Sequence, residues 1–314
     1  MLFRPTTATD LDRVAAYVVD DPVSWIPEDR YRKELAERGF RPEWTWIAEE
    51  DGEILARALW WGRGDSDHPL ALDCLHVSRS VRDRAALAAE LLATGQRAFR
   101  AEGAKQDPLY NLSLPDGWRE DPAISEAVAW RKTAADLAGL GEEVERFRYA
   151  WTPDSGVPER AGRLVFSPEP DDEAFVAVFR RIAVGSLDIG TRRKLAAMGA
   201  DRQARDDLDF YLGCPGKREW WRLARTQEGA VVGMAIPSRT PYNPNVGYLG
   251  VVPEFRGQGH IDEILAEITR FHADNGAQRI TATTDTVNVP MAAAFDRAGY
   301  RATEIRLNFE PPPA

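Results

Sequence analysis

The sequence predicts an α/β fold that occurs twice in tandem, and three observations lead to this expectation. The chain has 314 residues, enough for two domains of about 150 residues each. Strand and helix patterns follow the same order in both halves: strand, helix, helix, hairpin, strand, helix, strand, helix, strand. A polar segment rich in Pro and Gly separates the two series. We therefore expect one domain over residues 1–151, a linker over 152–162 and a second domain over 163–314.

Apolar and alternating runs predict the strands of both halves, and apolar residues three and four apart predict the helices. In the first half, strands are expected over residues 2–5, 44–50, 54–61, 70–77, 109–114 and 144–151, and helices after the capping residues Thr9 and Asp10 and over 25–40, 84–102 and 124–137. In the second half, strands are expected over residues 164–166, 220–225, 230–238, 248–252, 279–284 and 303–309, and helices over 171–182, part of 188–209, 261–274 and 289–298.

Composition narrows the class of protein. A formal net charge of −10 disfavours a nucleic-acid partner, which would normally face a basic surface. The two cysteines, Cys74 and Cys214, lie far apart, and the four histidines form no ligand pattern, so we expect neither a disulfide framework nor a metal site. No apolar run is long enough to span a membrane, and the first residues do not form a signal peptide. We expect a cytoplasmic protein, monomeric or homodimeric, without a membrane partner.

The most informative stretch lies between residues 246 and 265. An apolar run over residues 248–252 stops at Pro253 and predicts a buried strand. An amphipathic helix then follows, with apolar residues at three- and four-residue steps: Ile261, Ile264, Leu265, Ile268 and Phe271. Between the strand and the helix lies Arg256-Gly-Gln-Gly259, where two glycines allow a tight turn that points several N–H groups one way. Because the first N–H groups of a helix have no partner within it, this stretch predicts a pyrophosphate cradle. The tetrapeptide alone is also compatible with a plain turn and an exposed arginine.

This stretch and the elements after it resemble the closing half of the GNAT superfamily of N-acetyltransferases. The family's acetyl-CoA motif, Gln/Arg-X-X-Gly-X-Gly/Ala, matches residues 256–261, and its later Asn…Tyr…Gly-Phe pattern is mirrored by Asn288, Phe295, Gly299 and Tyr300. Two residues depart from the family: Ile261 replaces a Gly or Ala, and Phe295 replaces the Tyr that acts as general acid in many members. The resemblance implies two tandem GNAT folds, each with a mixed, mostly antiparallel central sheet flanked by helices, and acetyl-CoA as co-substrate.

The resemblance also implies where acetyl-CoA binds. The end of the central strand would bond the pantetheine arm like an added strand, and the backbone N–H of Val251 or Val252 would stabilise the thioester oxyanion. Gly247 and Gly250 are compatible with a bulge that opens the slot. We expect these residues to bind the cofactor: Val251, Val252, Arg256, Gly257, Gln258, Gly259, His260, Ile261 and Asn288.

Proton transfer has several candidates, and two interpretations stay open for each. Asp285 follows a strand on the acceptor side, where it would accept a proton or bind a cationic substrate, or merely cap the next helix. Tyr248 would line the slot or fill the core, and Asp188 would meet a cationic acceptor or cap a helix. Asn288 would contact pantetheine or cap its helix.

The first half lacks the glycine turn. After the strand over 70–77 it has Ser78-Arg-Ser-Val-Arg-Asp-Arg-Ala85, without glycine. Bulky side chains hinder backbone N–H groups from closing on a pyrophosphate, so we expect a degenerate domain that does not bind acetyl-CoA in the usual way. The arginines of this segment are compatible with some other anion or with a solvated helix start.

The function predicted from these features is transfer of an acetyl group from acetyl-CoA to a primary amine of a small molecule or peptide, by direct attack in a ternary complex. A catalytically silent acyl-CoA-binding or regulatory protein is the alternative, because Phe295 replaces the usual acid. A nucleotide-phosphate enzyme of Rossmann or P-loop type would need Gly-X-Gly-X-X-Gly after an early strand or Gly-Lys-Ser/Thr, and neither follows any expected strand.

Overall fold

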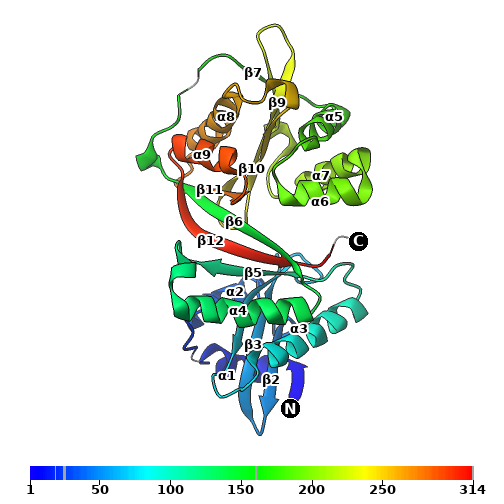
Figure 1. Cartoon of the computed structure of the whole chain (residues 1–314), viewed down its shortest axis with the longest axis vertical. Coiled ribbons are helices and arrows are strands. Elements are labelled where there is room, and N and C mark those ends of the chain that lie inside the picture. Colours follow the sequence, from blue (N-terminus) through cyan, green and yellow to red (C-terminus); the bar gives the residue numbers. More distant parts are fainter. Residues whose placement is uncertain (18, 24–25, 160, 313–314) are drawn as a thin grey trace. The chain divides into compact units, whose positions relative to one another are not determined.

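The computed structural model describes residues 1–17, 19–23, 26–159 and 161–312. The chain forms two compact units (Figure 1): unit 1 contains residues 1–145 and 305–312, and unit 2 contains residues 146–304. Some expected positions lie outside the described residues, namely Trp25 in the helix over 25–40, Arg160 in the linker over 152–162, and the last two residues of the second domain.

Unit 1 is a sheet with the strand order β1-β2-β3-β4-β5-β12. Its strands are β1 (Leu2–Pro5), β2 (Thr45–Glu50), β3 (Glu53–Trp61), β4 (Ala71–Val77), β5 (Leu109–Leu114) and, through residues 305–309, β12 (Arg301–Glu310). Its helices are α1 (Leu11–Ala15), α2 (Glu28–Ala36), α3 (Arg84–Ala101) and α4 (Pro122–Leu137). β4 and β5 are parallel, and the other neighbouring strands are antiparallel.

Unit 2 has the strand order β6-β11-β10-β9-β8-β7. Its strands are β6 (Glu142–Trp151), β7 (Val165–Pro168), β8 (Arg222–Arg225), β9 (Val231–Arg239), β10 (Pro244–Val251) and β11 (Ile280–Asp285). Its helices are α5 (Asp172–Ala183), α6 (Ile189–Met198), α7 (Ala200–Gly213), α8 (His260–Asp274) and α9 (Val289–Arg297). β10 and β11 are parallel, and the other neighbours are antiparallel. The predicted fold class, two mixed and mostly antiparallel sheets flanked by helices, is confirmed.

The terminal strands do not follow chain order. β6, the last strand of the first half, pairs with β11 over residues 146–151, and these residues belong to unit 2. β12, the last strand of the chain, pairs with β5 over residues 305–309, and these residues belong to unit 1. Each unit therefore completes its sheet with a strand from the other half of the sequence.

Local backbone geometry accounts for the boundaries that differ from the expected ones. The helix expected over residues 25–40 is α2, which ends at Ala36, because the chain turns through Arg38 at a φ of 61°. The polar segment over 188–209 forms two helices, α6 and α7, separated by Gly199 at a φ of 77°. The strand expected from residue 220 starts at Arg222, because the preceding residues form a 3₁₀ turn.

Two hydrophobic clusters cover the faces of the unit 2 sheet. On one face, α8 contributes the fully buried Ile264, Leu265 and Ile268, which pack with α9 and with sheet residues such as Val232. The second cluster joins Phe175 and Phe179 of α5 and Leu208 of α7 to Met234 and Ile236 of β9. These clusters fix α8 and α5 relative to β10, the strand between them on which the candidate site depends (Figure 1).

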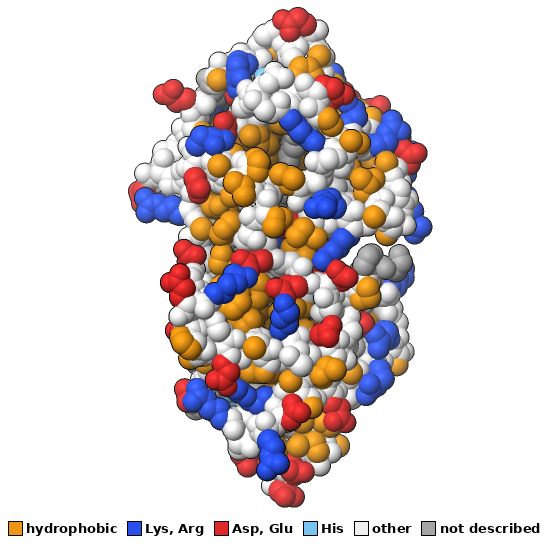
Figure 2. Space-filling view, in the orientation of Figure 1, with side chains coloured by type: hydrophobic (Ala, Val, Ile, Leu, Met, Phe, Trp, Pro, Cys, Tyr) orange, Lys and Arg blue, Asp and Glu red, His pale blue; other side chains and the backbone are white. Residues whose placement is uncertain are grey.

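Within the described ranges, no helix combines the length and hydrophobicity needed to cross a bilayer. On the face seen in Figure 2, basic and acidic side chains are interspersed over both units, as on an ordinary solvated surface.

Candidate functional site

The glycine turn before α8 leaves a run of backbone N–H groups open. Gly257 and Gly259 have φ values of 76° and 74°, in the left-handed region that favours glycine. Gly259 is the N-cap of α8 and provides no side-chain cap. Among the described residues, none accepts a hydrogen bond from the backbone N–H groups of residues 257–260. These groups lie at the positive end of the helix dipole, so the turn can bind an anion.

An ion pair between the exposed Arg163 and the buried Glu263 holds this turn from behind. Glu263 is only 5% exposed and accepts a hydrogen bond from Nε of Arg163 at 2.7 Å. The same guanidinium donates to the carbonyls of Gln258 at 2.8 Å and Gly259 at 3.1 Å. In a trans peptide the N–H points opposite to the C=O, so the N–H groups of Gly259 and His260 point away from Arg163. The spacing of residues along one helix could not reveal Arg163 as the partner of Glu263, because the two partners are 100 residues apart.

The central strand β10 separates from β11 along most of its length. Their pairing is confined to Asn245 opposite Thr281. On the other side, the register of β10 against β9 shifts between Asn245 and Tyr248, where Gly247 has a φ of 69°. A Cβ on Gly247 would lie 2.2 Å from the carbonyl oxygen of Ile236, so no larger residue fits there. The predicted bulge is therefore confirmed, and β10 presents an unpaired edge toward β11.

Strand alternation identifies the backbone groups on that edge. The N–H of Val252 donates to the carbonyl of Val232 at 2.9 Å, so it is not open to a ligand. In an antiparallel pair, successive residues point their backbone groups to opposite sides. The N–H and C=O groups of Leu249 and Val251 consequently face the gap toward β11. Of the two N–H groups considered for the oxyanion, that of Val251 has the required direction.

Arg256 is engaged with the protein backbone. Its Nε donates to the carbonyl of Val251 at 3.0 Å, and its two Nη atoms donate to the carbonyls of Ile182 at 2.6 Å, Val184 at 2.7 Å and Gly185 at 3.2 Å. The last three carbonyls lie at the C-terminal end of α5, where helix carbonyls lack intrahelical partners. Arg256 therefore joins the end of α5 to the end of β10, next to the glycine turn.

The other predicted cofactor residues lie on or beside the turn. Gln258 is exposed, and its amide donates to the carbonyl of Glu254 at 3.4 Å. His260 is buried beside Phe255, with ring centroids 6.0 Å apart, and burial lowers the pKa of its imidazole. Ile261 packs against the hydrophobic cluster under α8. Asn288 is the N-cap residue of α9, but its side chain does not make the capping bond, so its amide is available to a ligand.

Asp285 is a junction of three elements. Its side chain is fully buried and accepts hydrogen bonds from Nε of Arg146 on β6 at 2.9 Å and from the backbone N–H of Ile189 on α6 at 2.6 Å. Its carbonyl accepts the N–H of Asn288 at 2.9 Å. Asp285 could serve as a base through a lone pair that these two hydrogen bonds leave free, or after its carboxylate released Arg146 or the N–H of Ile189. Asp188 directly precedes Ile189 in the chain. It caps α6, where its side chain accepts the N–H of Thr191 at 2.6 Å.

Tyr248 lies among aromatic rings on the α5 and α7 side of the sheet. Its ring centroid is 4.9 Å from that of Phe179 and 5.4 Å from that of Tyr211. Burial raises the pKa of Tyr248 far above its usual value, so the phenol stays protonated and can only donate a proton.

Phe295, at the position of the family's acid, stacks on Tyr149 at a centroid distance of 4.8 Å. Tyr300 is tied to Thr269 by a hydrogen bond of 2.8 Å inside the core. Phe295 and Tyr300 therefore have packing roles here. Within the described part of the chain, no cluster of three or more His, Cys, Asp or Glu residues is suited to a metal ion.

Unit 1 has the same strand divergence with different side chains around it. β4 pairs with β5 only at Ala71 and Leu72. The N–H of Ser78 donates to the carbonyl of Leu55 at 2.8 Å, so Ser78 is equivalent to Val252 of unit 2. Leu75, three residues earlier, is therefore equivalent to Leu249. The carbonyl of Leu75 is bound by the guanidinium of Arg131, whose Nη2 lies 3.0 Å away.

The helix after this strand also starts differently. α3 begins with Asp83 as N-cap, and its carboxylate accepts the N–H of Ala86 at 2.9 Å. A carboxylate in this place satisfies part of the helix N-terminus and repels a second anion. The groups that are open in unit 2 are thus occupied in unit 1.

An open helix N-terminus beside an unpaired strand edge can bind an anion next to an extended chain with backbone amides. Residues 142–301, about half of the chain, match the acetyltransferase (GNAT) domain family. The chain belongs to the GNAT acetyltransferase family, whose chemistry is acyl transfer.

Solved structures support the fold over the whole chain. A GCN5-related N-acetyltransferase from Sphaerobacter thermophilus is similar with a TM-score of 0.55 and 16% identity, covering 100% of this chain and 96% of that one. A glucosamine N-acetyltransferase region of a fungal multi-domain β-N-acetylglucosaminidase gives a TM-score of 0.54 at 15% identity, covering 98% of this chain and 38% of that one. A tandem GNAT protein from the clavulanic acid biosynthesis pathway matches at 17% identity and a TM-score of 0.48, covering 100% of this chain and 99% of that one. No curated protein matches the chain.

Proposed function

We propose that this protein is an acetyl-CoA-dependent N-acetyltransferase in which unit 2 binds acetyl-CoA and transfers the acetyl group to a primary amine. The observation that carries the proposal is the run of open N–H groups over residues 257–260 next to the unpaired edge of β10. The first feature suits a pyrophosphate and the second suits the amides of a pantetheine arm. Both lie in the region that matches the family.

The residues divide into those that contact acetyl-CoA and those that hold the contacts in place. The N–H groups of Gly257, Gln258, Gly259 and His260 would bind the pyrophosphate. The backbone groups of Leu249 would bond the pantetheine amides, and the side chain of Asn288 would reach the same arm, while Val251 offers only its N–H because Arg256 binds its carbonyl. Arg256 would act through position, because its donors already bind four backbone carbonyls.

The transfer itself would be a direct attack in a ternary complex. The nitrogen of a neutral amine attacks the thioester carbonyl carbon, a C–N bond forms, and the C–S bond breaks to release the thiolate of coenzyme A, which then takes a proton. The N–H of Val251 would stabilise the negative charge on the carbonyl oxygen during this step. Holding both reactants in place can supply a large part of the rate enhancement.

Two groups could handle protons near this position. Tyr248 remains protonated, so it would donate to the departing thiolate rather than act as a base. Asp285 would take a proton from the ammonium form of the substrate, or bind it, through a free lone pair or after releasing Arg146 or the N–H of Ile189. A solvent path for the amine proton is the remaining route.

The test is a thiol-release assay with acetyl-CoA and a panel of amines that includes polyamines, amino sugars, amino acids and peptide N-termini. Release that depends on one amine class, with an acetylated product identified by mass spectrometry, supports the proposal. A Val251→Pro variant, which removes the N–H proposed for the oxyanion, should lower turnover by about a hundredfold. Unchanged turnover in this variant would contradict the assigned role of Val251.

A catalytically silent acyl-CoA-binding protein is the second candidate. It is favoured by Phe295 at the acid position and by the two partners of Asp285. Acetyl-CoA binding by a folded protein that releases no thiol with any amine class would favour this second function.

A further inference from the structure

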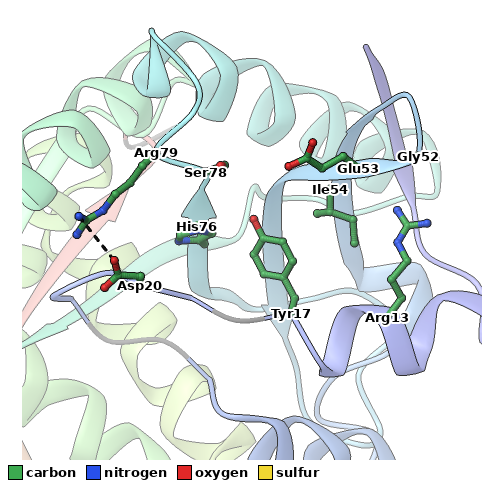
Figure 3. Close-up of a pocket in the computed structure, with 9 residues that line it drawn as sticks. All are labelled: Arg13, Tyr17, Asp20, Gly52, Glu53, Ile54, His76, Ser78 and Arg79. Atoms are coloured by element: carbon green, nitrogen blue, oxygen red, sulfur yellow. Dashed lines mark ion pairs between the residues drawn. The ribbon is translucent and has the colours of Figure 1, made fainter.

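A separate pocket of about 550 Å³ lies in unit 1. It opens between the segment after α1, the start of β3 and the end of β4 (Figure 3). Tyr17 and His76 lie side by side in Figure 3, with Arg79 on one side of them and Arg13 on the other. None of these residues takes part in the acetyl-transfer site of unit 2.

His76 is the buried polar group of this pocket. It lines the cavity, it is only 4% exposed, and its ring packs edge-on against Tyr17 at 5.5 Å. Its Nδ1 has no hydrogen-bond partner among the described residues, and the nearest carboxylate oxygen, on Asp21, is 3.8 Å away. Burial lowers the pKa of His76 to about 4, and the cations Arg131, Arg57 and Arg84 act in the same direction. At neutral pH the ring is therefore uncharged and can donate or accept one hydrogen bond at each nitrogen.

The layer under the pocket carries an uncompensated positive charge. Arg57 lies directly opposite His76 in the sheet, so both side chains share one face, and Arg57 is 1% exposed. Only its Nη1 has a partner, the carbonyl of Val14 at 2.7 Å, whereas Nε and Nη2 have none among the described residues. The other buried guanidinium, Arg131, pairs with Asp21 at 2.9 Å. Arg57 is thus a buried cation without a carboxylate partner among the described residues, and such a charge is costly.

The rim adds charged groups of both signs. Arg79 and Asp20 lie 3.7 Å apart and are both exposed, and the guanidinium of Arg13 pairs with Glu49 outside the pocket. Glu53 is an exposed acid on the opposite wall. The exposed pair of Arg79 with Asp20 is weak, so Arg79 can turn toward a ligand at little cost, whereas Arg13 would have to leave the half-buried Glu49, which keeps Arg4 as its second partner. The rim acids are solvated, while the excess of positive charge lies at the floor.

We propose that this pocket binds a small molecule through an oxyanion, either a phosphate or a carboxylate group. Arg13 and Arg79 contact the oxyanion from the rim, His76 donates a hydrogen bond from the floor, and the field of Arg57 favours negative charge above it. The pocket lies at the point of unit 1 that corresponds to the glycine turn of unit 2, because Ser78 and Arg79 begin the segment that replaces this turn. Unit 1 would thus bind its anion with side chains where unit 2 uses backbone N–H groups.

Two histidines can report on anion binding in the two units. It has four histidines, of which His76 lines this pocket and His260 lies at the turn of unit 2. Histidine ring signals of the full chain would be followed by NMR near neutral pH while inorganic phosphate, and separately acetate, is raised to about 20 mM at constant ionic strength. That range exceeds the roughly millimolar dissociation constant expected for a bare ion. His76→Gln and His260→Gln assign the two signals.

The proposal predicts a saturable shift of the His76 signal, independent of the His260 signal. Arg79→Gln should raise the dissociation constant read from His76 about tenfold, since it removes a charged donor. The matched control, Arg82→Gln, removes an exposed arginine that does not line the pocket and should leave the constant unchanged. Tighter binding of phosphate or of acetate decides between a phosphorylated and a carboxylated ligand. No shift of His76, a shift of His260 alone, or equal constants in the two arginine variants would overturn the proposal.

Discussion

The two units place different residues at the same point of one fold, after the strand that diverges from its parallel neighbour. In unit 2, the turn after β10 contains Gly257 and Gly259 in left-handed conformations and starts α8 without a side-chain cap. In unit 1, the turn after β4 has no glycine and starts α3 with the carboxylate of Asp83 on the N–H of Ala86. The same helix N-terminus is thus open in one unit and satisfied by the chain in the other. The difference teaches that one capping residue can decide whether such a helix is able to bind an anion.

The edges of the diverging strands differ in the same way. The backbone groups of Leu249 face an open gap, whereas the carbonyl of the equivalent Leu75 is bound by Arg131. Arg131 is 1% exposed, and it also donates to Asp21 at 2.9 Å and to the carbonyl of Ala127 at 2.9 Å. Unit 1 has therefore turned a ligand slot into part of its own core.

The largest expected effect comes from breaking that core. Arg131→Met leaves Asp21 buried without a charged partner and should lower the free energy of unfolding by about 3–5 kcal/mol. Chemical denaturation checks this value, and adding Asp21→Asn should recover part of the loss. Arg97→Met on the exposed side of α3 is the matched control and should change stability by less than about 0.5 kcal/mol. A loss no larger than that of the control would mean that Arg131 does not stabilise unit 1.

The second prediction gives unit 2 the cap of unit 1. Gly259→Asp places a carboxylate at the N-terminus of α8 and should weaken acetyl-CoA binding by about a hundredfold or more, through repulsion and loss of open N–H groups. Calorimetric titration measures the change. Gly276→Asp is the control, since Gly276 has a φ of 79° and follows the far end of the same helix, so backbone strain is similar. Equal binding by the two variants would show that the cradle is elsewhere.

The third prediction concerns a feature that both units share, a buried neutral histidine. Burial lowers the pKa of His76 in unit 1 and of His272 in unit 2 to about 4, from about 6.5 in an unfolded chain. Between these values the unfolded chain takes up protons that the folded chain refuses, so stability falls as the pH drops. Each histidine should contribute a loss of about 2 kcal/mol between about pH 7 and pH 5.

Denaturation curves at several pH values measure this loss. His272→Gln keeps a donor for the carbonyl of Asn245 and should remove only the part of the pH-dependent stability loss that His272 causes. An unchanged pH dependence in that variant would refute the assignment. Asp10 does not confuse the measurement, because its pKa in the unfolded chain is about 3.9 and the hydrogen-bonded Arg4 lowers the pKa further in the folded chain, so its contribution changes only below about pH 5.

The smallest predicted effect is that of Arg256→Ala. Its four backbone bonds place the end of α5 against the end of β10, so the variant should raise the KM for acetyl-CoA about tenfold while kcat changes less. Arg181→Ala, a neighbouring exposed arginine paired with Glu254 at 3.4 Å, is the control. A direct phosphate contact by Arg256 would instead give a salt-dependent loss of affinity with no loss of stability.

Local patterns were sufficient to predict the fold class and the glycine turn before α8. The apolar run of β10, the two glycines and the amphipathic face of α8 each act within a few residues, so their outcome can be derived from sequence spacing. The bulge at Gly247 was predicted for the same reason and is confirmed.

Contacts between distant residues were beyond the reach of such patterns. The ion pair of Arg163 with Glu263 joins residues 100 positions apart, and that of Arg146 with Asp285 joins residues 139 apart. These pairs determine which way the cradle N–H groups point and how free the Asp285 carboxylate is. The pairing of β12 with β5 is equally nonlocal, because the hydrophobic pattern of a strand does not specify its partner.

The central claim is that unit 2 alone binds acetyl-CoA, and calorimetry tests it most directly. Acetyl-CoA is titrated into the wild-type chain and into Gly259→Trp, which forces a bulky residue into a left-handed backbone conformation and so disturbs the turn that holds the open N–H groups, with thermal unfolding as a check on folding. We predict one site per chain in the wild type and none in the variant. Two sites, or binding that survives Gly259→Trp in a folded protein, would contradict the account.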